Sequence, residues 1–143
     1  MLFAFAALCG CAMAPLPGND PSSVITAASA KIVFCSVPGT DCTPATSFSV
    51  SKLRALTIVV NWGNLSAGNH AQTLAVMDPS GGLYQSFHKG MLIDPNAGGS
   101  SSTSASLPVA GTWIVQRSMI GTWSVQASLD GQIVATQTVA LTP

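Results

Sequence analysis

The sequence predicts an all-β domain, an antiparallel sandwich of about seven to eight short strands, and three observations support this fold class. Short runs with apolar residues at alternate positions recur along the chain, separated by turn-forming residues at intervals of about ten residues. No stretch after residue 30 shows the apolar period that would indicate a helix. Charged residues make up only 7% of the chain, so Ser, Thr, Asn, Gln and Gly must cover the surface, as in exported β proteins.

The composition fits one packed domain without a charged partner. The chain has 143 residues, of which 48% are hydrophobic, enough to close a single core. Five basic and five acidic residues give a formal net charge of +0. This balance leaves no positive field to attract a phosphate backbone, so nucleic acid is not an expected partner.

The chain begins with an apolar run over residues 1–8, much shorter than the roughly 20 residues that span a bilayer. It is typical of the hydrophobic region of a secretion signal. The basic region that should precede it is missing, which suggests a true start upstream of Met1.

The tetrapeptide Leu8-Cys9-Gly10-Cys11 resembles the bacterial lipobox, although Cys9 stands where Ala or Ser is commoner. The resemblance implies that residues 1–11 form a lipoprotein signal segment and that Cys11 receives a lipid. Such a lipid would hold the protein on a membrane surface without spanning it. The competing processing site is Ala12-Met13-Ala14, where cleavage before Pro15 would release a soluble secreted protein.

Residues 12–29 have the Pro, Gly and Ser content of a linker, and we expect the folded domain to cover residues 30–143. Residues 31–35 predict a short first strand. Cys35 and Cys42 flank a Pro-Gly turn, and in an exported chain this spacing predicts a local disulfide. A metal site is the alternative, but no second Cys pair completes four ligands.

The strongest strand signal lies in residues 56–62, where Leu56, Ile58, Val60 and Trp62 share one face. Residues 70–77 predict the next strand, with Leu74 and Val76 directed inward. Residues 83–89 predict a more polar strand at a sheet edge. Residues 94–104 are rich in Gly and Ser and predict a loop.

One hexapeptide pattern occurs twice, at residues 111–116 (GTWIVQ) and 121–126 (GTWSVQ). Each copy predicts a strand with its Trp, Trp113 or Trp123, directed into the core beside a Val. Residues 105–109 and 112–116 then form one kinked strand. Residues 117–121 form either a hairpin loop or a crossover between sheets, and the sequence leaves both open.

The last hairpin contains a conflict between its turn and its apolar pattern. Inward residues have odd numbers on both sides of the turn, namely Trp123, Val125 and Ala127 before it and Ile133, Ala135, Val139 and Leu141 after it. A two-residue turn at Asp130-Gly131 would pair odd with even residues. We therefore predict a three-residue loop over residues 129–131 with Gly131 in the left-handed region, and Ala127 not opposite Val134.

This last part of the chain, with its Gly-x-Trp-x-Val strand, Asp-Gly turn and final strand, resembles the closing hairpin of bacterial immunoglobulin-like and fibronectin-like surface modules. The resemblance covers about a quarter of the chain. It implies an immunoglobulin-like β-sandwich and carries over no catalytic residue.

Residues for catalysis are few. His70, His88, Asp78 and Asp94 could serve a metal or acid–base site, but none has the spacing of a ligand motif, and both Asp residues precede Pro as in turns. The chain contains neither a Gly-x-Ser-x-Gly frame nor a phosphate-binding Gly loop. We therefore expect no enzyme, cofactor or metal. An acid–base enzyme would need His70 or His88 close to an acidic partner in a cleft.

The sequence thus predicts a non-catalytic binding or assembly module of the bacterial cell envelope, anchored on the outer or cytoplasmic membrane surface. Its partner would be another envelope protein or a surface glycan. The alternative is a carbohydrate-binding module in which Trp113 and Tyr84 form an exposed, coplanar pair for sugar stacking. A soluble secreted protein is the alternative location.

Overall fold

The computed structural model describes residues 27–37, 39, 41–96 and 98–143. The lipobox with Cys11 and all of the predicted linker before residue 27 lie outside these residues. The described chain forms eight strands and one short helix: β1 (Ser29–Cys35), β2 (Ser47–Ser49), β3 (Ala55–Gly63), β4 (Gly68–Met77), β5 (Leu83–Ile93), β6 (Ser101–Pro108), α1 (Trp113–Gln116), β7 (Gly121–Leu129) and β8 (Gln132–Thr142). No helix in this part of the chain is long and apolar enough to cross a membrane.

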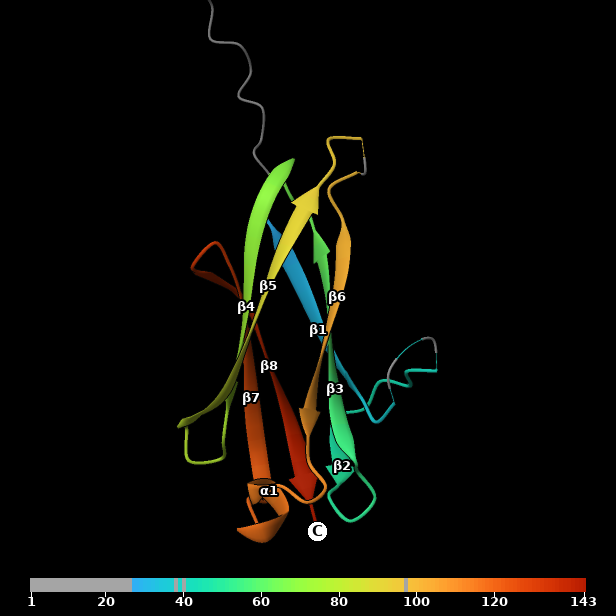
Figure 1. The fold of residues 1–143 in the computed structure, drawn as a ribbon, viewed down its shortest axis with the longest axis vertical. Helices are drawn as coiled ribbons and strands as arrows, with labels where there is room; N and C mark the ends of the chain where they lie inside the picture. Colours follow the sequence, from blue (N-terminus) through green and yellow to red (C-terminus); the bar gives the residue numbers. More distant parts are fainter. Residues whose placement is uncertain (1–26, 38, 40, 97) are drawn as a thin grey trace, which may run out of the picture.

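The strands form two sheets that face each other (Figure 1). One sheet has the order β1-β3-β6 and the other has the order β2-β8-β7-β4-β5. Neighbouring strands are antiparallel except β2 and β8, which are parallel. The predicted fold class, an antiparallel immunoglobulin-like β-sandwich, is confirmed.

The residues that were predicted to face the core in the main strands are buried, as expected. In β3, Leu56, Ile58, Val60 and Trp62 are each at most 3% exposed, so one face of the strand is directed into the core. In β4, Leu74 and Val76 are buried in the same way. β5 lies at the edge of the five-stranded sheet, as its polar sequence predicted, and is longer than expected.

The strand boundaries need two corrections. The Gly/Ser-rich loop is shorter than residues 94–104, because β6 begins at Ser101 and pairs along β3 up to Trp62. Small Ser and Thr side chains are accommodated there because the ladder supplies the backbone hydrogen bonds. The three-residue strand β2 was not predicted, since so short a run has no readable alternation.

The first hexapeptide copy is not a strand, so the prediction of a kinked strand through residues 112–116 is wrong. After a left-handed turn at Gly111 (φ 74°), Thr112 caps the single turn of α1 and its Oγ1 accepts a hydrogen bond from the Ile114 N–H. Ile114 is fully buried. Trp113 is 55% exposed instead of in the core, because the helix turns it away from Ile114. Residues 117–121 thus belong to a crossover from β6 in one sheet to β7 in the other.

The turn of the last hairpin also differs from the prediction. Leu129 pairs with Gln132, which leaves a two-residue loop, and both Asp130 (φ 50°) and Gly131 (φ 85°) have positive φ. These values are those of a type I′ turn. The predicted three-residue loop is wrong, although Gly131 does lie in the left-handed region.

A β-bulge resolves the conflict that had suggested the longer loop. Ser128 pairs with Ile133 but Ala127 pairs with Ala135, so Val134 has no partner on β7. From the bulge onward odd residues pair with odd residues, as expected, and Ala127 is not opposite Val134. Ile133, expected in the core, lies before the bulge and is 61% exposed.

A buried polar network joins the two sheets. The Gln72 Oε1 atom accepts hydrogen bonds from the Trp62 Nε1–H (2.6 Å) and from the Thr103 hydroxyl. Gln72 belongs to β4, whereas its two donors belong to β3 and β6 of the opposite sheet. The side-chain polar atoms buried in the described residues all have partners.

Candidate functional site

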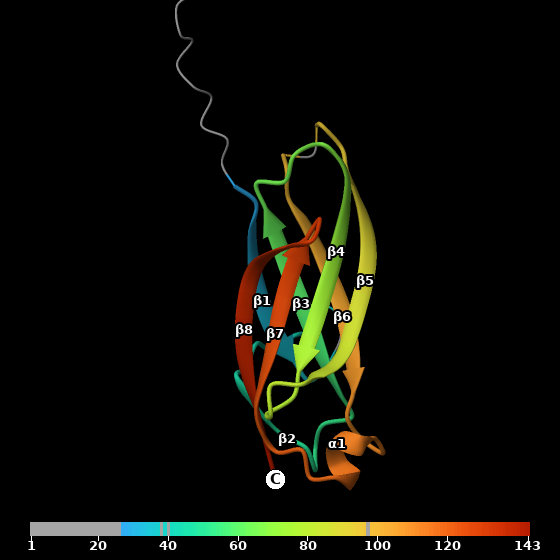
Figure 2. The same ribbon diagram turned by 90° about the vertical axis from the view of Figure 1, so that its left-hand side faces the viewer.

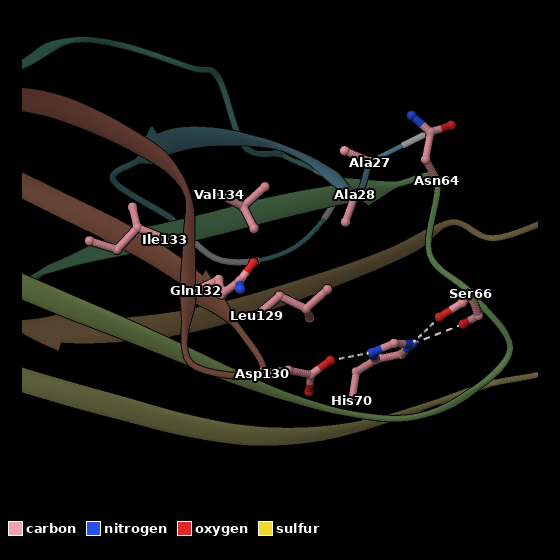
Figure 3. A pocket seen from close by; sticks show the side chains of 10 residues that line it. All are labelled: Ala27, Ala28, Asn64, Ser66, His70, Leu129, Asp130, Gln132, Ile133 and Val134. Atoms are coloured by element: carbon pink, nitrogen blue, oxygen red, sulfur yellow. Dashed lines mark hydrogen bonds and ion pairs between the residues drawn. The ribbon is translucent and has the colours of Figure 1, made fainter. Parts of the chain in front are cut away.

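A hollow of about 550 Å³ lies at the end of the sandwich where the chain enters β1. Ala27 and Ala28 form one wall (Figure 3). The opposite wall comes from the β7–β8 hairpin and from the start of β4, with His70, Leu129, Asp130 and Ile133 among the lining residues. The hollow is therefore built from segments that lie far apart in the sequence.

A His–Asp pair lies in this hollow. The Nδ1 atom of His70 is 2.7 Å from Oδ2 of Asp130. The other carboxylate oxygen of Asp130 accepts from the Ala71 N–H at 2.8 Å, while the Asp130 N–H donates to the Ala71 carbonyl at 2.8 Å. The type I′ turn is thus fastened to β4 by three hydrogen bonds, which fix the carboxylate beside the imidazole.

Both members of the pair favour their charged forms. The hydrogen bond to Asp130 raises the pKa of His70, and the carbonyl of Ser66 adds to the effect, whereas burial opposes it. The pKa of Asp130 is lowered first by the Ala71 N–H and then by the hydrogen bond with His70. The two groups form an ion pair when His70 is protonated.

Ser66, His70 and Asp130 have the residue types of a catalytic triad, but the hydrogen bonds differ from those of a triad. The His70 Nε2 atom is 3.3 Å from Oγ of Ser66 and 2.9 Å from the Ser66 carbonyl oxygen. A carbonyl accepts only, so Nε2 must carry a proton to bond it. An imidazole that is protonated toward a carbonyl cannot take the proton of the Ser66 hydroxyl. This arrangement suits a charged structural clamp better than a general base.

The other candidate acid–base residues do not join this site. His88 lies on β5, where its Nδ1 atom is 3.1 Å from the Thr73 hydroxyl. The Asp78 carboxylate accepts hydrogen bonds within its own turn, and the Ser80 hydroxyl is the largest cause that lowers its pKa. Asp94 likewise accepts from the Asn96 N–H at 2.7 Å. Across the described residues, no three His, Cys, Asp or Glu side chains are grouped as metal ligands.

The two candidate ligand contacts, Trp113 and Tyr84, differ in environment. Trp113 is exposed on α1, at the end of the sandwich opposite the entry of the chain, and the guanidinium carbon of Arg117 lies 3.7 Å from its ring centroid (Figure 1). Tyr84 is half-buried and packs edge-on against the buried ring of Trp123, with centroids 5.1 Å apart and an interplanar angle of 82°. Tyr84 is therefore part of the core margin.

The predicted disulfide between Cys35 and Cys42 is confirmed, with Cα atoms 5.3 Å apart. It closes the loop that follows β1, whereas the His70 hollow lies where the chain enters β1. The lipid attachment at Cys11 lies outside the described residues and stays a prediction.

Sequence reasoning named His70 but missed its partners, Asp130 and Ser66. Asp130 was interpreted only as a turn residue. The partnership depends on the β4–β7 register, in which Gln72 pairs with Leu129, and on the loop before β4. The sequence signals that could have suggested it are weak, because antiparallel strands distant in sequence can pair in many registers.

Comparison with known proteins supports the fold and goes no further. No protein-family model matches the chain, and no curated protein matches it. Among solved structures, an immunoglobulin-like protein from Pseudomonas aeruginosa is 12% identical, with a TM-score of 0.49 over 83% of this chain and 99% of that chain. The alkylpurine DNA glycosylase of Pseudomonas fluorescens is 8% identical, with a TM-score of 0.54 over 81% of this chain, which spans 30% of the glycosylase. A β-glucosidase from Listeria innocua is 11% identical, with a TM-score of 0.47 over 81% of this chain and 16% of the enzyme. At these identities the likeness concerns the fold alone.

Proposed function

We propose that this protein is a non-catalytic binding or assembly module of the bacterial cell envelope, anchored on a membrane surface through a lipid on Cys11. The lipobox-like tetrapeptide at residues 8–11 supports the anchor. The Cys35–Cys42 disulfide supports an oxidising compartment outside the cytoplasm. The protonated Nε2 of His70, which bonds a carbonyl, supports a role other than catalysis.

The observation that carries the proposal is the exposure of Trp113 at the end of the sandwich away from the anchored terminus. A Trp that is 55% exposed loses the stabilisation that burial would give it. Trp and Arg are the residue types that contribute most to protein interfaces, and here Arg117 stacks on Trp113. Figure 2 shows α1, which carries this Trp, at the end of the sandwich opposite the start of β1, so the pair would be available to another envelope component when the chain is held by its N-terminus.

A carbohydrate-binding module is the second candidate, since the exposed indole of Trp113 could stack on a sugar. The pair geometry that this function was expected to need is not met, because Tyr84 packs edge-on against Trp123. Arg117 also covers one face of the Trp113 ring. A sugar would therefore have one face of one ring, so a protein partner is favoured.

Two measurements on the protein in bacterial cells test the proposal. Mass spectrometry of the purified protein should find a lipid on an N-terminal Cys11, and an unmodified N-terminus at Met1 or Pro15 would remove the anchor. A photo-crosslinking amino acid at position 113 should capture an envelope protein. The matched control is position 92, because Leu92 is 76% exposed. Equal crosslinking at both positions would contradict a binding role for Trp113, and a captured glycan would favour the second candidate.

A further inference from the structure

One long side of the sandwich is open between β1 and β8. β8 pairs with β7 along its length, but its other edge pairs with β2 only from Ala140 to Thr142. β1 pairs only with β3, so its outer edge is also uncovered among the described residues. The two strands lie side by side at the same margin of the molecule (Figure 2). Among the described residues, no strand is hydrogen-bonded to this edge of β8 over residues 132–139, although β1 lies next to it.

The backbone of β8 directs hydrogen-bonding groups toward this open side. The Ala140 N–H donates to the Thr46 carbonyl at 2.8 Å, and the Thr142 carbonyl accepts from the Val50 N–H at 2.9 Å. Even-numbered residues of this part of β8 therefore face away from β7. Because direction alternates along a strand, the N–H and C=O groups of Thr138 and Thr136 face the same open edge.

The core-facing side chains of β8 become exposed toward the start of the strand. Leu141 and Val139 are each 1% exposed. Farther along the same face, Ala135 is half-buried and Gln137 is exposed. Gln137 thus lies on the core side of the sheet without being covered. An additional strand beside β8 would cover this part of the core margin.

Three hollows follow one another along this side. The first contains the His70–Asp130 pair and reaches residues 132–134. The second, of about 300 Å³, lies between residues 30–32 of β1 and residues 135–137 of β8. The third, of about 120 Å³, continues past Gln137 to residues 44–46, just before β2. All three hollows border the unpaired edge of β8.

The chemistry of the edge indicates what it would bind. Residues 132–139 contain no charged residue and no Pro, whereas the edge strand β5 carries Lys89 and β1 carries Lys31. Charges and Pro on an edge prevent pairing with other strands, and β8 has neither. We propose that the segment Ala135–Val139 of β8 is a strand-addition site, which binds an extended, uncharged peptide segment of a partner protein. The peptide would pair with the same edge of β8 that β2 pairs with farther along the strand.

In such a complex the N–H and C=O groups of Thr136 and Thr138 would pair with the incoming backbone. Alternate side chains of the peptide would point into the hollow that Lys31, Ile32 and Gln137 line, and they would have to be small to fit it. The site extends the proposed function by naming a class of partner. It does not involve Trp113 or the lipid, so the two proposals can fail separately.

A soluble form of residues 12–143, which keeps the whole predicted domain and its linker, is titrated with a labelled, end-capped peptide of alternating Thr and Val. Binding is measured by fluorescence anisotropy, and amide hydrogen exchange locates it. We expect slower exchange at Thr136 and Thr138. The same peptide with alternate amides N-methylated keeps its side chains but loses its donors, so it should bind about tenfold more weakly or worse.

Four protein variants make the test specific to the β8 edge. Thr136→Pro removes an outward N–H without removing a bond to β7, and it should weaken binding about tenfold, whereas Thr136→Ala keeps the N–H and should bind normally. Gln137→Lys adds a second Lys at an exposed position of the hollow that Lys31 already lines, and it should weaken binding at least about tenfold, which covers the case of a misfolded Pro variant. Leu92→Ala, at an exposed position of the opposite edge strand β5, should bind as the parent does.

Four outcomes would overturn the proposal. They are no binding at roughly millimolar peptide, protection in β5 instead of β8, equal binding of the N-methylated peptide, and self-association of the chain through β8 that excludes the peptide. The last outcome would assign the edge to a second copy of this protein.

Discussion

Replacing Ile114 with Ala tests which side chain of the first hexapeptide is buried. In the helical turn it is Ile114, whereas in a strand it would be Trp113 and Val115. Ile114 is fully buried, whereas Trp113 and Val115 are 55% and 42% exposed. The substitution removes three carbon atoms, worth about 0.8 kcal/mol each on burial, or about 2.4 kcal/mol together. The cavity left beneath α1 raises the expected loss of unfolding free energy to about 3 kcal/mol.

The assay is urea denaturation of the parent and of three single variants. Ile114→Ala should lower the midpoint most, and it should lower the melting temperature by roughly 10 °C. Trp113→Ala and Val115→Ala serve as matched controls, each expected to cost less than about 1 kcal/mol because their side chains are half in water. In a strand the order would be reversed, with Trp113 and Val115 in the core. A larger loss for Trp113→Ala than for Ile114→Ala would refute the helical assignment.

Three further predictions concern stability. Reducing the Cys35–Cys42 disulfide should lower the unfolding free energy by about 2–3 kcal/mol, and equal urea midpoints with and without reductant would contradict this. Because the pKa of His70 is raised in the folded protein, its contribution is fully present below about pH 6.5 and is lost as pH rises through the folded pKa. His70→Gln should therefore destabilise the protein more at about pH 5 than at about pH 9, and a difference independent of pH would refute the ion pair. Gln72→Leu leaves the buried indole N–H of Trp62 without an acceptor and should cost about 2 kcal/mol by thermal denaturation, whereas a neutral effect would show that this bond is dispensable.

The phase of the long strands could be predicted because burial on one face imposes a period of two on the sequence. Leu56 to Trp62 alternate with smaller or polar residues, and the structure buries the predicted set. The same reasoning placed β5 at an edge, where its polar side chains remain in contact with water. The first half of β6, residues 101–104, lacks this signal, since its residues are small and polar on both faces.

The repeated hexapeptide shows how similar sequences reach different structures. The second copy reads Trp-Ser-Val, and Trp123 and Val125 are buried on one face of β7. The first copy has Ile114 at the position of Ser124, so three apolar residues follow one another and alternation is lost. The core accepts only Ile114 from this run. A helical turn satisfies that requirement where the chain crosses between sheets, and the neighbouring Trp113 becomes exposed.

The candidate site was less predictable than the fold, for a physical reason. His70 and Asp130 are 60 positions apart and meet only because β4 pairs with β7 in one register. Neither residue belongs to the apolar pattern that selects that register. Their bond follows from the register that pairs Leu74 with Ala127 and Val76 with Val125, several residues away. Local sequence therefore names the titratable groups but not their partners.

The β7–β8 hairpin connects this packing to the open edge. Asp130 and Gly131 favour a two-residue turn, because both adopt positive φ. A two-residue turn pairs odd residues of β7 with even residues of β8. The core, in contrast, requires odd residues of both strands on one face, which is a shift of one residue. The bulge at Val134 supplies that residue. It leaves Ile133 exposed at the rim of the hollow, and it makes Thr136 the first residue of the regular edge whose backbone groups would pair with an added strand. The turn chemistry and the core together thus determine where the proposed strand-addition site begins.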